Sequence, residues 1–234
     1  MLVRAGVDVV PVSSLRHPLE RRRRLIEDLQ VDLVLDVGAN AGQYVSELRG
    51  IGYRGAVLSF EPLVEPFKVL SRRVQADPRW RAIKSAIGPS PGHADINVAA
   101  NGGASSSFLP MLQQVALNAP GATYIGIERV VIRRLDEASV EAVRSANATF
   151  LKADVQGYEL EVLDSATGIL PSVVGLQLEI SLVPLYEGAP SFIDVLERTR
   201  NLGFDLVGLE PGFTALDGRL LQADGLFERT GRGA

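Results

Sequence analysis

The sequence predicts an α/β fold, with a mainly parallel sheet and helices on both of its faces. Short aliphatic runs alternate with segments of helical character from residue 31 onward. The first run, residues 31–37 (VDLVLDV), is almost entirely apolar, as expected for a central parallel strand that is buried on both faces. The chain has 234 residues and no composition shift that would mark a linker, so we expect one hydrophobic core.

Each further strand is expected where a short β-branched or aliphatic run ends at turn residues. These runs lie at residues 56–60, 80–87, 149–155, 173–180, 204–209 and 220–227. Turn signals at residues 211–212 (PG) and 217–218 (DG) separate the last two runs, which are therefore expected to pair antiparallel. The expected architecture is a seven-stranded sheet with an antiparallel last strand.

The segments around these strands have the pattern of helices. We expect helices at residues 20–29, 44–49, 66–75, 158–170 and 191–202. The basic run Arg21 to Arg24 lies in the first of them and is expected to face solvent, because acidic residues flank it. A membrane surface or another anionic partner is the alternative for this run.

A long region, residues 88–148, separates the third and fourth expected strands. Its Gly, Ser, Asn and Pro content is highest over residues 88–107. Loops of this length in compact domains are usually functional covers or partly disordered. We therefore expect a substrate-side insertion at 88–148, within a catalytic domain of residues 31–234 that follows an N-terminal helical extension of residues 1–30.

Composition excludes several classes of function. The absence of cysteine excludes disulfides, thiolate metal sites and a cysteine nucleophile, and a count of only two histidines argues against a His-rich metal centre. The formal net charge of −4 argues against binding to nucleic acid. No apolar run approaches the ~18 residues of a membrane-spanning helix. Residues 1–12 lack the pattern of a secretion signal, so we expect a cytoplasmic protein.

A glycine-containing turn, residues 36–42 (DVGANAG), directly follows the first strand. Its glycines allow a sharp turn and let a ligand approach the main chain. Glu61 follows the second strand, 23 residues beyond Gly38, where nucleotide-binding α/β folds keep an acid for ribose hydroxyls. Such charge-assisted hydrogen bonds contribute roughly 1.5–3 kcal/mol each. The turn and Glu61 together predict a nucleoside site.

The spacing of the turn separates two classes of nucleoside ligand. A dinucleotide motif reads G-x-G-x-x-G, whereas this turn has Asn40 where a pyrophosphate needs room. The Asn40 amide suits an amino-acid end instead, which favours S-adenosylmethionine over NAD. Three alternatives stay open: glycines that serve only helix packing, a nicotinamide-dependent oxidoreductase, and an inactive nucleoside-binding domain.

A second informative stretch ends the fourth strand, at residues 150–163. Asp154 lies at the carboxyl end of that strand and is expected to face the same crevice as the glycine turn. For Glu159 and Glu161 a structural role is favoured, because acids at a helix start interact well with its dipole. Lys152 is expected either to pair with an acid or to extend outward, and we assign it no function.

These stretches resemble the FkbM-type methyltransferases, a branch of the class I S-adenosylmethionine-dependent enzymes. The resemblance covers about residues 31–227 and is carried by residues 35–42, 60–62, 105–107, 152–159, 178–181 and 185–188. It implies a Rossmann-like class I methyltransferase domain. It also implies O-methylation of a small molecule, commonly at a hydroxyl of a sugar in a glycolipid or glycoside, or of a polyketide-type secondary metabolite.

Methyl transfer to an alcohol needs a group that takes the hydroxyl proton. We rank Asp154 first for this role, Glu179 second and His93 third. Asp154 and Glu179 come from adjacent strand ends, so they could share a proton, act as base, or hold a divalent cation such as Mg²⁺. Glu179 is equally suited to a structural role, and a lone exposed His93 is more often incidental.

The remaining site residues follow from the same placement and, for the acceptor, mainly from the family resemblance. The methyl donor is expected to contact Asp36, Gly38, Ala39, Asn40, Gly42, Glu61, Pro62, Ala86 and Asp154. The acceptor is expected to contact Ser105, Ser106, Ser107 and Tyr186, although serines are also common in plain loops. The expected partner is a small molecule with a hydroxyl group, not a nucleic acid, and a homodimer stays open.

Overall fold

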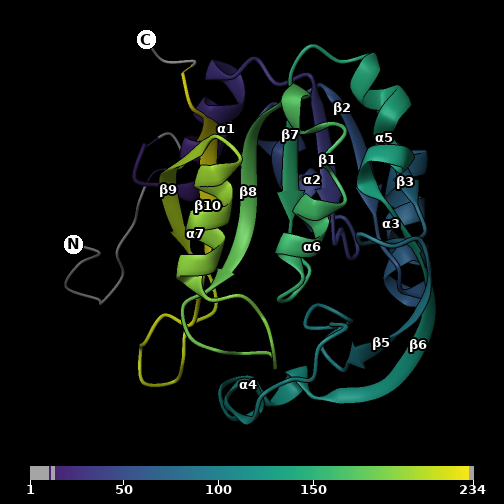
Figure 1. Cartoon of the computed structure of the whole chain (residues 1–234), viewed down its shortest axis with the longest axis vertical. Coiled ribbons are helices and arrows are strands. Elements are labelled where there is room, and N and C mark those ends of the chain that lie inside the picture. The colour runs from purple at the N-terminus through teal and green to yellow at the C-terminus, as the bar shows by residue number, and fades with distance from the viewer. Residues whose placement is uncertain (1–10, 12–13, 232–234) are drawn as a thin grey trace.

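Seven strands form the main sheet of the computed structural model, which describes residue 11 and residues 14–231 (Figure 1). In spatial order they are β3 (Trp80–Ile83), β2 (Ala56–Phe60), β1 (Leu33–Val37), β7 (Thr149–Ala153), β8 (Val173–Ser181), β10 (Gln222–Arg229) and β9 (Phe204–Pro211). β10 is antiparallel to both neighbours, and the other pairs are parallel. The predicted α/β class and the antiparallel last strand are confirmed. Most of residues 1–12, which bear on a secretion signal, lie outside the described residues.

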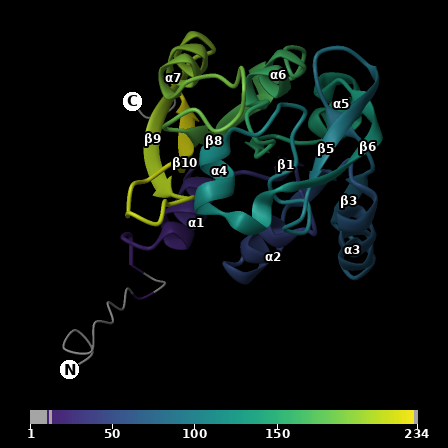
Figure 2. The same ribbon diagram turned by 90° about the horizontal axis from the view of Figure 1, so that it is seen from below.

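Helices cover both faces of this sheet (Figure 2). One face carries α1 (Pro18–Asp28), α2 (Gln43–Gly50) and α3 (Val64–Gln75), and the other carries α5 (Leu135–Arg144), α6 (Glu159–Asp164) and α7 (Phe192–Asn201). α7 begins with a capping box, in which Ser191 and Asp194 each satisfy a free backbone N–H of the other. None of the helices in the described ranges is long and apolar enough to cross a membrane.

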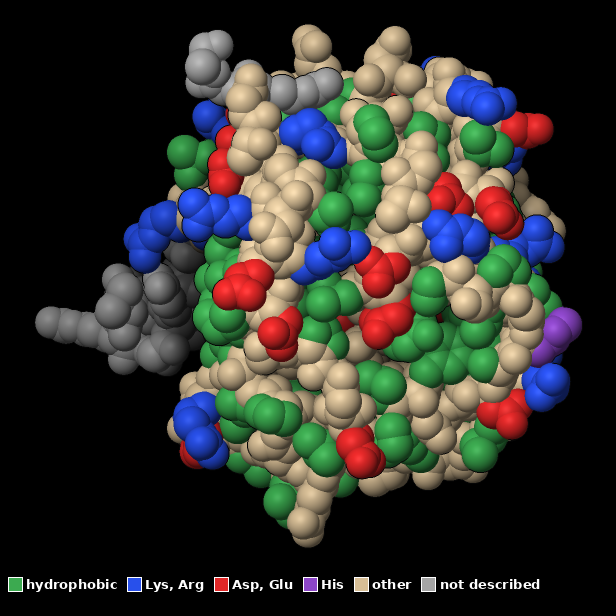
Figure 3. Space-filling model, viewed as in Figure 1, with side chains coloured by type: hydrophobic (Ala, Val, Ile, Leu, Met, Phe, Trp, Pro, Cys, Tyr) green, Lys and Arg blue, Asp and Glu red, His purple; other side chains and the backbone are tan. Residues whose placement is uncertain are grey.

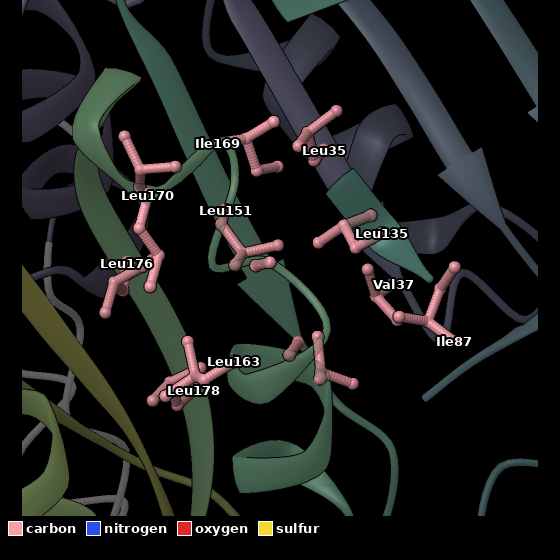
Figure 4. Packing of buried hydrophobic residues seen from close by; sticks show 14 of the residues in the cluster. Leu35, Val37, Ile87, Leu135, Leu151, Leu163, Ile169, Leu170, Leu176 and Leu178 are labelled. Atoms are coloured by element: carbon pink, nitrogen blue, oxygen red, sulfur yellow. The ribbon is translucent and has the colours of Figure 1, made fainter. Parts of the chain in front are cut away.

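The largest apolar cluster lies between the sheet and the α5–α7 layer (Figure 4). Leu35 and Val37 of β1 face this layer together with Leu151 of β7, and they pack near Leu135 and Leu163 from the helices. Because side chains alternate across a strand, the residue between the two β1 side chains points the other way, toward α2. That residue is Asp36, a buried carboxyl among otherwise apolar strand residues.

Two expected elements differ from the structure. The third expected strand, residues 80–87, is divided into β3 and β4 (Ala86–Ile87), because the chain leaves the main sheet after β3 and β4 pairs with β6 in a second sheet. α6 ends at Asp164 and not at residue 170. Beyond that end, the Asp136 carboxylate accepts a hydrogen bond from the backbone N–H of Gly168 and so holds the chain in a turn.

Residues 88–148 contain ordered strands that the expectation of a loop-like cover did not include. β5 (Gly92–Ala99) and β6 (Tyr124–Arg133) form an antiparallel pair, and β4 extends it to three strands in the order β4-β6-β5. The segment also contains the short helix α4 (Gln113–Asn118) and all of α5. Figures 1 and 2 show β5 and β6 beyond the carboxyl ends of the main strands, so this segment borders the predicted site.

Candidate functional site

A cavity of about 330 Å³ lies at the carboxyl ends of β1, β2 and β7, next to the loop that follows β5. This volume is at the lower end of the range for small-molecule sites, roughly 300–1,000 Å³. Of the nine residues expected to contact a methyl donor, seven form part of its wall: Gly38, Ala39, Asn40, Glu61, Pro62, Ala86 and Asp154. The cavity therefore coincides with the site that the two strand-end motifs predict.

Glu61 has a defined orientation in this wall. One carboxylate oxygen accepts a hydrogen bond from the backbone N–H of Asn40, and the other accepts one from the N–H of Leu63, both at 2.8 Å. Burial raises the pKa of Glu61 to about 7, although these two hydrogen bonds oppose the shift. Each oxygen of a carboxylate has two acceptor sites, so both can accept a further hydrogen bond from a ligand.

Gly38 allows β1 and β7 to approach closely beneath the cavity. Its φ is +75°, and a Cβ on it would lie 1.9 Å from the carbonyl oxygen of Asp154. The backbone N–H of Asp154 in turn donates to the carbonyl of Val37 at 3.1 Å. Any side chain at this position would separate the two strand ends, so the glycine has the steric role that the sequence predicts.

Asp36 is not part of the cavity wall, contrary to the expectation of donor contact. Its Oδ2 accepts a hydrogen bond from Ser59 Oγ at 2.9 Å, and its Oδ1 lies 3.2 Å from Lys152 Nζ. Lys152 also donates to the carbonyl of Gly38 at 2.9 Å. These neighbouring charges hold the pKa of Lys152 above its usual value despite burial. Asp36 thus positions Lys152. Of the two alternatives expected for Lys152, the structure shows the ion pair with an acid.

Gly42 also lies outside the cavity wall. It precedes α2 with a φ of +87°, and a Cβ on it would lie 2.6 Å from the indole ring of Trp80. A glycine that serves helix packing was one of the open alternatives, and the geometry favours it for this position. The other glycine of the motif, Gly38, is on the wall.

The Asn40 amide does not face a ligand as expected. Its Nδ2 donates to the carbonyl of Gly102 at 3.0 Å, and its Oδ1 accepts from the N–H of Ala41 at 2.7 Å. The side chain therefore fastens the glycine turn to the loop after β5. Asn40 forms part of the cavity wall, while its Oδ1 and one N–H of its Nδ2 are already bound within the protein.

Gln156 connects the two carboxyls that the sequence ranks as candidate bases. Its Nε2 donates to Asp154 Oδ1 at 2.9 Å and to Glu179 Oε2 at 2.5 Å. Asp154 and Gln156 line the cavity, whereas Glu179 does not. Burial and the charge of Asp154 raise the pKa of Glu179 well above its usual value. Within the described part of the chain, no group of three or more His, Cys, Asp or Glu residues is arranged to hold a metal ion.

Most of the expected acceptor residues make contacts within the protein. Ser107 Oγ donates to the carbonyl of Gln156 at 2.7 Å, and Tyr186 Oη donates to Gln156 Oε1 at 2.6 Å. Neither residue is in the cavity wall, and the same holds for half-buried Ser105 and for exposed His93 on β5. Ser106 does line the cavity, where its Oγ accepts from the N–H of Ala99.

The far end of the cavity has apolar walls that sequence reasoning did not assign. Ile87, Ile96 and Phe108 line it together with Tyr158, whose ring lies 5.2 Å from that of Phe108. Ser85 lies beside them with a buried Oγ that has no hydrogen-bond partner in the described structure. This combination of flat apolar surface and one free hydroxyl suits a heterocyclic base.

Arg22 is another residue that the sequence did not predict in the site. It comes from the basic run of α1, but its side chain is only 7% exposed and lines the cavity, in contrast to the solvated face expected for the run. Its guanidinium pairs with Glu210 at 2.7 Å and Glu47 at 3.0 Å. Spacing could have indicated its burial, since Arg22 precedes buried Ile26 by one helical turn.

Comparisons with known proteins agree with this geometry. The sequence model of a family described as "Methyltransferase FkbM domain" matches residues 36–206, more than half of the chain. Comparison with curated proteins gave no match.

The solved structure of methyltransferase FkbM from Methylobacillus flagellatus KT is 16% identical, with a TM-score of 0.51 over 84% of this chain and 43% of that one. A structure of a fibrillarin/Nop5p complex is 14% identical, with a TM-score of 0.50 over 85% and 72%. The chain thus spans less than half of the first of these proteins, and both likenesses concern the fold.

Proposed function

Because the chain belongs to the FkbM methyltransferase family, we propose that it transfers the methyl group of S-adenosylmethionine to a hydroxyl group of a small molecule. Family membership confirms the predicted resemblance and supports the general activity, methyl transfer. Three finer points are proposed: that S-adenosylmethionine is the methyl donor, that an oxygen atom accepts the methyl group, and that the acceptor is a small molecule. These points rest on the cavity and on the side chains around it.

The observation that carries the proposal is the orientation of Glu61 in the cavity wall, where its carboxylate binds the backbone of the glycine turn at Asn40. S-adenosylmethionine, when bound, supplies an electrophilic methyl group on sulfur. Glu61 would accept hydrogen bonds from the ribose hydroxyls, since both of its oxygens retain an acceptor site. Ile87, Ile96 and Phe108 would contact the adenine, and the free Ser85 hydroxyl offers a partner for its polar edge.

Asp154 is the carboxylate we propose for the proton of the acceptor hydroxyl. Its side chain is 38% exposed, lines the cavity and is held by Gln156 and by Lys152, whose Nζ lies 3.7 Å away. Glu179 is bonded to Gln156 and Gln222 outside the wall, which supports a structural role.

The acceptor is proposed to be a sugar or polyketide-type hydroxyl compound. The net charge of −4 and the scattered Lys and Arg side chains on the face in Figure 3 support a small molecule over a nucleic acid.

The donor part of the proposal is tested by calorimetric titration with S-adenosylhomocysteine and with NAD. We expect binding of the first, and Glu61→Ala should weaken it by at least about tenfold through the loss of two charge-assisted hydrogen bonds. Glu65→Ala is the matched control, because Glu65 is 80% exposed on α3. Tight binding of NAD alone, or an unchanged affinity in Glu61→Ala, would contradict the proposed site.

The acceptor part is tested with isotopically labelled S-adenosylmethionine and a panel of glycosides and polyketides, with and without a chelator. Labelled O-methyl product supports the proposal, and its loss with chelator would indicate a divalent cation. Label found only in N-methyl or C-methyl products would contradict transfer to oxygen.

A further inference from the structure

The end of the cavity that faces α1 is polar and is built from four separate elements. Arg22 of α1, Tyr44 of α2, Gln177 of β8 and Asp224 of β10 all line it. Arg22 and Asp224 lie outside residues 36–206, so the family match does not include them. Strand register places Asp36, Lys152 and Gln177 side by side on the face that α1 and α2 cover. Asp224 comes from the next strand in the sheet.

Polar atoms of this wall lack partners within the described structure. Arg22 Nε, Tyr44 Oη and Gln177 Oε1 are buried without a hydrogen bond, and their residues are 6%, 8% and 3% exposed. The carboxylate of half-buried Asp224 also accepts no hydrogen bond from any described group. Buried polar groups are nearly always paired, because an unpaired one costs about 1–3 kcal/mol. Two free donors and two free acceptors on one wall therefore indicate a polar ligand.

The charges of these groups define the ligand further. Arg22 is cationic, and its positive charge opposes the rise that burial and Asp154 impose on the pKa of Asp224. A guanidinium N–H and a phenol O–H can both donate to a carboxylate, while a carboxylate and an amide oxygen can both accept from an ammonium. A group that carries one carboxylate and one ammonium, such as an α-amino acid, matches all four.

The order of residues along the sheet indicates which part of the methyl donor would reach the polar end of the cavity. Glu61 follows β2, Gly38 follows β1, Asp154 follows β7, and Asp224 lies on β10 beyond β8. With ribose at Glu61 and the base at the apolar end, the rest of the molecule points across β7 toward β10. We propose that Arg22 and Tyr44 bind the carboxylate, and Asp224 and Gln177 the ammonium, of the amino-acid end of S-adenosylmethionine. This assignment rests on the proposed function and replaces Asn40, whose amide is bound to Gly102.

The test compares two ligands that differ only in this end. S-adenosylhomocysteine carries the amino acid, whereas 5′-methylthioadenosine lacks it, and both are titrated by calorimetry against the wild-type chain, Tyr44→Phe and Asp224→Asn. Tyr44→Phe removes the proposed phenol donor, Asp224→Asn removes the negative charge that faces the ammonium, and both change little volume. We expect each substitution to lower the affinity for S-adenosylhomocysteine about tenfold and the affinity for 5′-methylthioadenosine less than about twofold. Arg24→Met is the control on α1, because Arg24 is 53% exposed and should leave both affinities unchanged.

The outcomes separate this inference from the proposed function. Equal losses for the two ligands, or no loss for either, would overturn the assignment of the amino-acid end while leaving the nucleoside site intact. Equal affinity of the wild-type chain for both ligands would overturn it as well. If the wild-type chain bound neither ligand, the proposed function itself would fail, and the inference with it.

Discussion

Gly42, at the start of α2, packs beside Trp80 at the start of β3, since a Cβ on Gly42 would lie 2.6 Å from the indole ring. A residue of the glycine turn therefore has a packing role. Trp80 Nε1 donates to Ser59 Oγ at 2.9 Å, and Ser59 donates to Asp36. Asp36 then holds Lys152 beneath the glycine turn. At the scale of single residues, part of the motif therefore supports the cavity from below without lining it.

Gly42→Ala should destabilise the protein by about 1–3 kcal/mol, because it combines a left-handed backbone with overpacking against Trp80. Urea denaturation measures the free energy of unfolding. Gly50→Ala is the matched control, since Gly50 ends α2, has no positive φ and has open space around its Cα. Equal unfolding free energies for Gly42→Ala and the wild type would show that Trp80 accommodates the methyl group without cost.

At the scale of elements, β6 is fastened to the N-terminus of α3. The Glu128 carboxylate accepts a hydrogen bond from the backbone N–H of Val64 at 3.0 Å. Val64 is the first residue of α3, whose N-cap Leu63 offers no side-chain acceptor. Glu128 thus provides from another sheet the acceptor and the negative charge that a helix start favours. This contact places the second sheet beside the Glu61 side of the cavity.

Glu128→Ala should lower the free energy of unfolding by about 1 kcal/mol through loss of this cap. The measurement is again urea denaturation. Arg129→Ala is the control on the same strand, because Arg129 is 69% exposed and its ion pair with Asp95 contributes little. A loss in Arg129→Ala as large as that in Glu128→Ala would assign the effect to strand propensity and not to the cap.

At the scale of the whole molecule, buried carboxyls collect at the carboxyl edge of the sheet. Burial raises the pKa of Glu61 and of Glu159 to about 7 and that of Asp224 to about 6. The folded protein therefore binds more protons than the unfolded chain between the ordinary pKa values and these raised ones. Stability consequently falls as pH rises through this window.

We expect the free energy of unfolding to decrease from pH 5 to pH 8, by an amount on the order of 3 kcal/mol for a carboxyl shifted from 4.5 to about 7. Glu159→Gln should make this decrease smaller, because it removes one titrating group. Urea denaturation at a series of pH values measures how steeply the free energy of unfolding falls with pH, and Glu187→Gln is the control because Glu187 is exposed. A slope in Glu159→Gln equal to that of the wild type would contradict the raised pKa.

The sequence alone was sufficient for the α/β class, for most strand positions and for the placement of Gly38, Glu61 and Asp154 around one cavity. These features depend on local patterns: a buried parallel strand is apolar throughout, and its carboxyl end is marked by a turn. Strand β5 was missed because residues 88–107 are rich in Gly, Ser, Asn and Pro and so resemble a loop. Strand β6 was missed although residues 124–133 (YIGIERVVIR) carry the β-branched run that is typical of a strand.

Only the tertiary structure decided which partner each polar side chain has. Arg22, Tyr44, Gln177 and Asp224 are far apart along the chain, and no local spacing relates them, yet α1, α2, β8 and β10 bring them to one wall. The Asn40 amide likewise binds Gly102, 62 residues away. A hydrogen bond depends on the position of both partners, and for distant residues that position exists only once the elements have packed.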